Sequence, residues 1–492
     1  MKPILTLDRT ALALLIDGTV HLMLELHTPD APVAARAPID TVVVIDRSGS
    51  MSGAPLAAVT RATADLLKLA GADDRIGVVA FDSEVNLVLP LARHDADRAA
   101  ATVRAIRPGG NTNLSGGWLK AMEMLSTDRR PDAVTRILLL TDGHANAGIV
   151  EPEQLNTLTS AAKRDGITTT CVGFADGYDQ RLLAGMADAG GGNDYWCAGP
   201  DQAGTVFRTE FAGLASLVAQ NVSVELRPTA VVDDYAVLNE FPITNVPGGM
   251  QIALGDSYGG ERRRVVAMLH VTPQQTEGML DVAELVLRYA SVGDTVGLHT
   301  VTIPVAVQIG GDIDSAVENP EVVEQVRLLR AATARREAST LADHGDLSGA
   351  AIMLEKSIEL LELTSFDESE MSELRTDAER LRRHDWDLRS SKRHFAASRE
   401  VQRSRASRFV TSATIVTCGV EAALNGVQDF AHFDIEKTHT VESALSQMVT
   451  LAHSRPRHGD VACPERTIAL GPRRPVDAHE RCAHGRRNVR RS

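Results

Sequence analysis

The stretch "VVVIDRSGSMSG", Val42–Gly53, decides the fold. It begins as a run of β-branched residues, which is typical of a strand buried on both faces. It then turns polar, with an acid, an arginine and three serines spaced by small residues. Three kinds of site use such a turn: a serine nucleophile, a phosphate-binding loop, or a metal site made of hydroxyl and carboxylate oxygens. The rest of the sequence has to distinguish them.

Apolar strands alternate with amphipathic helices from about Thr41 to Gln220. "DRIGVVAF", "TRILLLTDG" and "GITTTCVGFA" are typical of buried strands, whereas "APLAAVTRATADLLKLA" has apolar residues at helical spacing. This order predicts an α/β fold with a doubly wound, mainly parallel sheet covered by helices on both faces. We predict that the last helix is "DQAGTVFRTEFAGLASLVAQ", residues 201–220. Ligands of such sheets bind beyond the carboxyl ends of the strands.

The α/β domain, residues 38–220, is flanked by segments of another kind. Residues 221–310 alternate polar and apolar side chains between turns, which predicts an antiparallel β-sandwich. Residues 1–37 include "ALALLID" and "VHLMLELHTP", which have the same character, so we expect them to join the sandwich around an inserted α/β domain. Residues 315–404 predict a helical hairpin with a further helix. Residues 405–492 are predicted to be partly helical and then a disordered basic tail.

Composition narrows the class of protein. A chain of 492 residues exceeds one ordinary domain, and its 43% hydrophobic and 24% charged residues are typical of a folded globular protein. The net charge of −14 argues against nucleic acid as the main partner, except through the basic tail. The five cysteines form no C-x-x-C pair, so neither a disulfide framework nor a zinc knuckle is expected, and Cys171 and Cys197 are expected to be buried.

The N-terminus superficially resembles a secretion signal, because Lys2 and Arg9 precede an apolar run. Asp8 and Asp17 interrupt that pattern, so we predict strands there instead. No other run approaches the roughly 20 apolar residues of a membrane helix. The expected location is therefore cytoplasmic.

Polar oxygens gather at the predicted carboxyl ends of the strands. Asp46, Ser48 and Ser50 alternate directly after the first buried strand, Thr112 lies in "GGNTNLSGG", and Asp142 follows the strand "RILLLT". If the first strand is central, these segments meet at one edge of the sheet. Hydroxyl and carboxylate oxygens suit a hard divalent cation, above all Mg²⁺, with Mn²⁺ or Ca²⁺ as alternatives.

The competing kinds of site fit less well. Neither Ser48 nor Ser50 lies in a G-x-S-x-G elbow, and His144 is the sole nearby candidate base, which we expect at the rim. No phosphate-loop motif occurs, and Ser48 stands where an aspartyl phosphotransferase would need a second acid after Asp46. A capped helix start would use the same letters as this turn. Thr112 and Asp142 favour the metal site, and we expect no enzymatic activity.

The turn and its two companion loops resemble the von Willebrand factor type A family, a Rossmann-like fold. "DRSGS" matches the D-x-S-x-S motif of that family, and the "GNTNLS" and "LLTDG" segments match its threonine loop and second aspartate. The resemblance covers about residues 38–220 and implies a metal-ion-dependent adhesion site. In that site Ser48, Ser50 and Thr112 supply side-chain oxygens, while Asp46 and Asp142 act directly or through water. "IALGDSYGGERRRVV" is similar to the region after this domain in bacterial multidomain members.

The resemblance implies that one coordination position is left for water or for a carboxylate of a protein partner. We therefore predict a non-catalytic, metal-dependent protein–protein interaction module. Two alternatives stay open: a metal-stabilised structural or self-assembling protein, and an accessory subunit of an ATP-driven chaperone or metal-inserting enzyme complex. The role of Arg47 is left open between the surface and the rim, and Asp82-Ser83 is predicted to be a hairpin turn.

Overall fold

The structure, a computed structural model, describes residues 1–31, 36–292, 297–310, 318–403 and 405–406. The predicted tail lies outside these residues except for Arg405–Ala406, which forms the short strand β17 on β14. None of the helices in the described ranges is both long enough and apolar enough to span a membrane.

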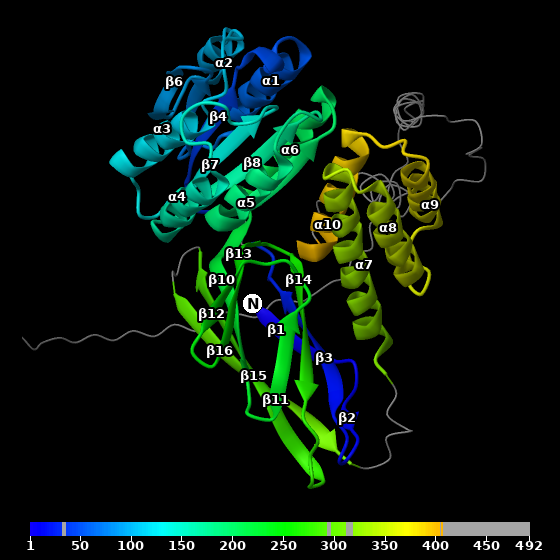
Figure 1. Ribbon diagram of the computed structural model, residues 1–492. Helices are drawn as coiled ribbons and strands as arrows, with labels where there is room; N and C mark the ends of the chain where they lie inside the picture. The colour runs from blue at the N-terminus through cyan, green and yellow to red at the C-terminus, as the bar shows by residue number, and fades with distance from the viewer. Residues whose placement is uncertain (32–35, 293–296, 311–317, 404, 407–492) are drawn as a thin grey trace, which may run out of the picture. The chain divides into compact units, whose positions relative to one another are not determined.

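A six-stranded sheet in the order β6-β5-β4-β7-β8-β9 forms the centre of the α/β domain, which confirms the predicted fold class (Figure 1). All pairings are parallel except that of β5 with β6. The strands are β4 (Ile39–Asp46), β5 (Arg75–Phe81), β6 (Val85–Ala92), β7 (Val134–Thr141), β8 (Ile167–Phe174) and β9 (Gly191–Cys197). The helices are α1 (Ala54–Leu69), α2 (Ala96–Arg104), α3 (Leu114–Thr127), α4 (Pro152–Arg164), α5 (Gln180–Gly190) and α6 (Ala203–Ala215).

Strand β4 is buried on both faces. Val43 and Ile45 pack into the core beneath α1 and α6, whereas Val42 and Val44 pack into the opposite core with α3 and α5. Because β4 pairs with both β5 and β7, its carboxyl end lies in the middle of the sheet edge. The segments that follow β4 and β7 therefore emerge side by side.

The predicted last helix is wrong at its C-terminal end. Helix α6 ends at Ala215, and strand β10 (Leu217–Pro228) begins two residues later, so the predicted domain boundary at residue 220 falls inside a strand. Ala219 pairs with both Ser257 and Ser291 on neighbouring strands. "LVAQ" carries no periodicity that separates a helix end from a strand start, and its strand partners are distant in sequence.

Two further sheets share one apolar core built from both. Their orders are β1-β3-β14-β11 and β12-β13-β10-β15-β16-β2, with antiparallel pairing except between β16 and β2. Strand β3 (Gly18–His27) pairs along its whole length with β14 (Arg262–Val271), so segments before and after the α/β domain lie in one sheet. The remaining strands are β1 (Lys2–Leu7), β2 (Ala11–Leu12), β11 (Val232–Val237), β12 (Ile243–Val246), β13 (Gly249–Tyr258), β15 (Gly278–Ser291) and β16 (Leu298–Ile309).

The N-terminal strand prediction is correct in kind and wrong in detail. Of "ALALLID" only Ala11–Leu12 forms a strand, β2, and Leu15 beyond it has a positive φ of 64°. A β-branched or bulky residue in that region of φ marks a turn. Strand β1, Lys2–Leu7, lies in the N-terminal stretch that was predicted to form strands, and it pairs with β3 along its six residues.

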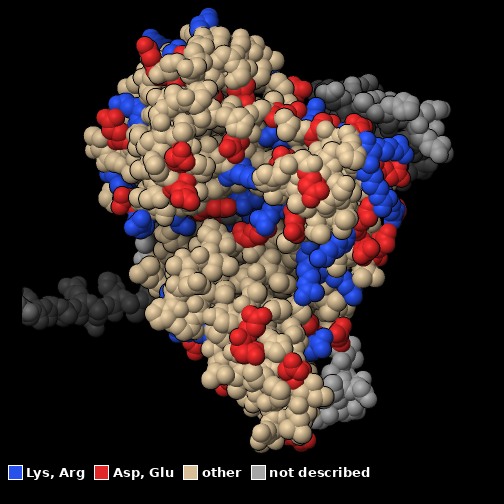
Figure 2. Space-filling view, viewed as in Figure 1, with Lys and Arg blue, Asp and Glu red and all other residues tan. Residues whose placement is uncertain are grey.

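Four helices follow within residues 318–403, one more than predicted: α7 (Pro320–Asp343), α8 (Leu347–Leu361), α9 (Glu368–Arg382) and α10 (Leu388–Arg403). Figure 2 shows basic and acidic side chains next to one another over these helices, in keeping with ion pairs such as Arg382–Glu355. Helix α10 contacts the α/β domain through Arg399, whose guanidinium lies 2.8 Å from Asp188 and 2.7 Å from Asp194.

Candidate metal centre

The turn after β4 is organised by Asp46. This side chain is fully buried at the end of the strand, and its Oδ1 accepts a 2.7 Å hydrogen bond from the backbone N–H of Ser48. A short 3₁₀ turn, Gly49–Met51, follows, and the buried Met51 anchors it in the apolar core. Helix α1 begins immediately afterwards. The carboxylate therefore fixes the backbone that presents the two serine hydroxyls.

The two serine hydroxyls of the turn lie within hydrogen-bonding distance of each other, and that of Ser50 also reaches the second aspartate. Ser48 Oγ lies 3.2 Å from Ser50 Oγ, and Ser50 Oγ donates a 2.7 Å hydrogen bond to Asp142 Oδ1. Ser48 is buried, whereas Ser50 is exposed. The cluster is therefore open to solvent on the Ser50 side.

Thr112 joins the cluster from the loop before α3. A methyl group placed on Gly143 would lie 3.4 Å from Thr112 Oγ1 and 3.7 Å from Ser50 Oγ, so both hydroxyls border the same space. The threonine is 4% exposed, and its backbone N–H donates a 2.7 Å hydrogen bond to Asn146 Oδ1. The N–H of Asn146 donates in return to the Thr112 carbonyl at 3.2 Å. The structure thus brings all five sequence-predicted site residues together, and we call them the oxygen cluster: Asp46, Ser48, Ser50, Thr112 and Asp142.

The spacing of these oxygens suits a magnesium ion. Octahedral Mg²⁺ with bond lengths near 2.05 Å separates neighbouring ligand oxygens by about 2.9 Å. The observed separations of 3.2 Å between the serine hydroxyls and 2.7 Å from Ser50 to Asp142 bracket that value. Three of the five donors are hydroxyls, and only Asp46 and Asp142 are carboxylates. A group of three or more His, Cys, Asp or Glu side chains that could hold a metal does not occur in the described ranges.

The charges of the oxygen cluster point the same way. No ion pair involves Asp46 or Asp142 in the part of the chain that the structure describes. Burial raises the pKa of Asp46, and hydrogen bonds from Ser48 and Thr141 offset this only in part. Burial likewise raises the pKa of Asp142. Two close, desolvated carboxylates that form no ion pair within the described residues favour a bound cation.

The supporting roles of three residues were not predicted from the sequence. Arg47, whose role was open, forms a 3.2 Å ion pair with Asp82, and the Asp82 carboxylate also accepts a 3.0 Å hydrogen bond from the N–H of Gly110. Asp82 thus ties the turn after β4 to the threonine loop and is more than the hairpin turn that was predicted. Thr141 Oγ1 donates a 2.5 Å hydrogen bond to Asp46 Oδ2. The position of Thr141 directly before Asp142 was the one feature of the sequence that could have indicated its supporting role.

His144 lies at the rim, as expected. Its side chain is 69% exposed, and its Nδ1 lies 3.9 Å from Asp179 Oδ2. No hydrogen bond joins it to Ser48 or Ser50 in the described structure. The serines therefore have hydroxyl and carboxylate neighbours, which suits ligands better than nucleophiles.

This arrangement defines the class of an α/β domain with a candidate divalent-cation site at the carboxyl edge of its sheet. The model of the von Willebrand factor type A domain family matches residues 40–206, and the chain accordingly carries a domain of that family. The match includes neither the two sheets that share an apolar core, whose strands lie before and after it, nor the helical region.

Relatives and solved structures extend the comparison. The uncharacterized protein sll0103 of Synechocystis is 27% identical over 333 residues, which cover 65% of this chain and 78% of that protein. The E3 ubiquitin-protein ligase WAV3 of Arabidopsis thaliana is 32% identical over 251 residues, 49% of this chain and 32% of the ligase. The solved structure of a von Willebrand factor type A protein from Catenulispora acidiphila matches with a TM-score of 0.63 at 19% sequence identity, and the match covers 80% of this chain and 96% of that one. This last likeness concerns the fold and reaches beyond the α/β domain.

Proposed function

We propose that the chain is a non-catalytic protein-interaction module that holds Mg²⁺ in the oxygen cluster and binds a carboxylate of a partner protein there. The observation that carries the proposal is the convergence of five oxygen donors, from three separate segments, around two carboxylates that no basic side chain in the described structure neutralises. A family shared with proteins as different as a ubiquitin ligase supports a reusable interaction domain.

The residues of the oxygen cluster have distinct parts in this proposal. Ser48, Ser50 and Thr112 would bind the ion through neutral hydroxyls, while Asp46 and Asp142 would supply negative charge directly or through water. When bound, the ion supplies a positive centre that accepts an anionic oxygen. Because the buried Asp46 lies at the base and Ser50 is exposed, the partner would approach from the Ser50 side.

Chelation tests the proposal. A pull-down with the tagged full chain in Mg²⁺ is expected to retain partners that are released by EDTA, and Asp46→Ala is expected to lose them in either condition. Partner capture that is the same for the parent and Asp46→Ala would overturn the proposal. Metal-dependent melting or light scattering without metal-dependent partners would instead favour a structural or self-assembling role.

The cytoplasmic location and the absence of enzymatic activity stay predictions of the same proposal. A non-catalytic role agrees with the surroundings of Ser48 and Ser50, which in the described structure include no hydrogen-bonded histidine. Turnover of any substrate that is abolished by Ser50→Ala would contradict it.

A further inference from the structure

A basic hollow lies next to the oxygen cluster. Its volume is about 380 Å³, and it lies between the first turns of α1 and the segment that follows α2. Three arginines line it, Arg61 from α1, Arg104 from α2 and Arg107 from the loop beyond, together with Gly53 and Pro108. We call this feature the arginine hollow.

The three guanidinium groups have no acidic partner among the residues that the structure describes. Arg107 donates from Nη1 to the backbone carbonyls of Arg104 and Ile106, each at 3.2 Å. Within the described residues none of the three arginines forms an ion pair, although the whole chain carries a net charge of −14. All three side chains are exposed. Three like charges around one concave surface favour an anion there, and guanidinium groups bind carboxylates with two parallel hydrogen bonds.

Both walls of the arginine hollow lead directly into the oxygen cluster. Gly53 follows Ser50 by three residues, so their Cα atoms are separated by at most about 11 Å. On the other wall, Pro108 continues into Gly109 and Gly110, and the Gly109 N–H donates a 2.7 Å hydrogen bond to the Arg47 carbonyl. The Gly49 N–H donates to the Gly110 carbonyl at 3.1 Å. A ligand held at the oxygen cluster therefore has the arginine hollow within reach.

We propose that the arginine hollow binds a second carboxylate of the same partner, so that the recognised ligand is an extended acidic segment with two Asp or Glu residues. This inference rests on the proposed function, because the first carboxylate is the one at the oxygen cluster. Gly53 borders the arginine hollow within about three extended residues, about 10 Å, of Ser50, and Arg61 lies eight residues further along α1. The spacing between the two acids is therefore three residues or more. The negative charge of the chain as a whole disfavours a nucleic acid as the source of the anion.

Synthetic peptides and arginine variants test the inference. The probes are fluorescein-labelled Gly/Ser peptides that carry either two Asp residues, in a series with three to seven positions between them, or one Asp and one Asn at the same positions. Binding to the full chain is measured by fluorescence anisotropy in Mg²⁺ and in EDTA. The variant is Arg61→Gln/Arg104→Gln/Arg107→Gln. Arg98→Gln is the matched control, because Arg98 is an exposed arginine of α2 that does not line the hollow.

In Mg²⁺ the triple variant is expected to bind the two-Asp peptide about 10- to 100-fold more weakly than the parent, since each of the three exposed charge pairs contributes at most about fivefold to the affinity. The one-Asp peptide and Arg98→Gln should show no such change. In EDTA the two-Asp peptide should keep weak binding that depends on the three arginines, because the hollow needs no metal.

The outcomes separate the two proposals. Binding that depends on Mg²⁺ but is equal for both peptides, or equal for parent and triple variant, overturns the arginine hollow and leaves the oxygen cluster standing. Arginine-dependent binding without any effect of Mg²⁺ overturns the proposed function and leaves an acidic-peptide site at the hollow. Tighter arginine-dependent binding of a single-stranded oligonucleotide than of the two-Asp peptide would identify the partner as nucleic acid and overturn the inference.

Discussion

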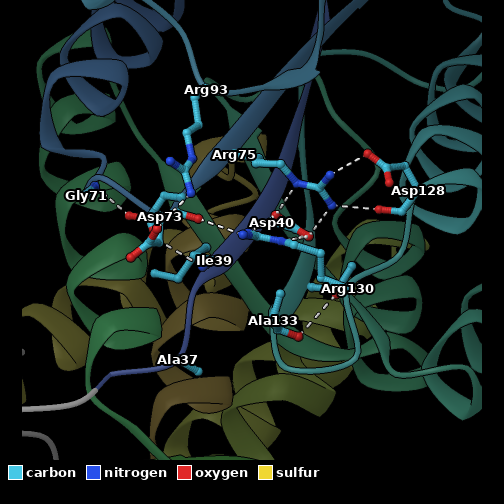
Figure 3. A network of polar contacts seen from close by, with 12 residues as sticks. Ala37, Ile39, Asp40, Gly71, Asp73, Arg75, Arg93, Asp128, Arg130 and Ala133 are labelled. Carbon is cyan, nitrogen blue, oxygen red and sulfur yellow. Dashed lines mark hydrogen bonds and ion pairs between the residues drawn. The ribbon is translucent and has the colours of Figure 1, made fainter.

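Strand β4 carries a buried aspartate near each end, and the two differ in what surrounds them. Asp40, near the start, is 1% exposed and lies between two arginines. Arg75 donates to it from Nε at 2.9 Å and from Nη2 at 2.7 Å, and Arg130 donates from Nε at 3.1 Å (Figure 3). Burial alone would raise the pKa of Asp40, but these arginine hydrogen bonds outweigh it and the pKa is lowered. At the other end, the donors to Asp46 in the described part of the chain are hydroxyl and backbone N–H groups, and its pKa is raised by burial.

The contrast shows that the lack of an ion-pair partner at Asp46 is specific to the carboxyl edge of the sheet. Arg47 is the next residue along the chain, yet it pairs with Asp82 and with neither carboxylate of the oxygen cluster. The opposite edge of the sheet is rich in basic partners, since Arg36 also holds Asp74 with hydrogen bonds of 2.8 Å and 2.7 Å. One edge therefore neutralises its carboxylates internally, and the other leaves room for an external cation.

Replacing Asp40 with Asn should give the largest loss of stability. Two guanidinium groups would lose their shared carboxylate, and we expect the free energy of unfolding to fall by about 2–4 kcal/mol, somewhat less than for a fully buried pair because both arginines reach solvent. Urea denaturation measures this, and the loss should be the same with Mg²⁺ and with EDTA. Asp73→Asn is the control, because its 2.7 Å pair with Arg93 is exposed and is worth at most about 1 kcal/mol. A loss no larger than that of the control would show that Asp40 is dispensable.

Asp46→Asn should behave in the opposite way. Without metal, the amide keeps the shape and can still accept from the Ser48 N–H, so stability should be unchanged or slightly higher. With Mg²⁺ at about 100 times its Kd, the parent should gain about 2.7 kcal/mol and the variant almost nothing. Thermal unfolding in Mg²⁺ and in EDTA measures both values. If Asp46→Asn loses as much stability in EDTA as Asp40→Asn does, the carboxylate at this end is structural too and the comparison fails.

The site at the carboxyl end of β4 could be predicted from the sequence, whereas the ion-pair network around Asp40 at the other end could not. Asp46, Ser48 and Ser50 lie within five residues at a strand end, and the parallel order brings Thr112 and Asp142 to the same edge, so a local pattern was sufficient. The Asp40 network joins residues that are 35 and 90 positions apart. No periodicity connects those positions, and the arginines alone look like ordinary surface residues.

The fold divides in the same way. The mainly parallel sheet was predictable because its strands are apolar on both faces, and Cys171 and Cys197 are buried as expected. Two features depend on distant partners and were missed: the strand start at Leu217, which pairs with Tyr258, and the ion pair between Arg47 and Asp82. In each case the structure of a short segment depends on contacts with residues that are distant in the sequence, so the local pattern does not predict it.

Lowering the pH should separate the stability that depends on Asp40. The pKa of this group is lowered below its ordinary value of 3.8, so its contribution is fully present above that value and is lost as the pH falls through the folded-state pKa. The stability difference between parent and Asp40→Asn should therefore be constant from about pH 7 to pH 5 and shrink below about pH 4. Urea titrations at several pH values measure it. A difference that does not change with pH would mean that shape, and not charge, explains the effect of the substitution.

Gly143→Ala should have the smallest effect on the fold and a selective effect on the oxygen cluster. Its methyl group would lie 3.4 Å from Thr112 Oγ1 and 3.7 Å from Ser50 Oγ, which is contact without a clash. The free energy of unfolding in EDTA should change by at most about 0.5 kcal/mol, as for most substitutions without a buried clash. The methyl would, however, hinder the two hydroxyls from closing on an ion, so Mg²⁺ affinity should fall about three- to tenfold, equivalent to about 1 kcal/mol. Calorimetric titration with Mg²⁺ measures this, with Thr112→Val as the reference for loss of one hydroxyl ligand. Unchanged affinity in Gly143→Ala together with full affinity in Thr112→Val would place the ion away from Thr112, and the carboxyl edge of β4 would then hold a cation through fewer ligands than its five oxygens suggest.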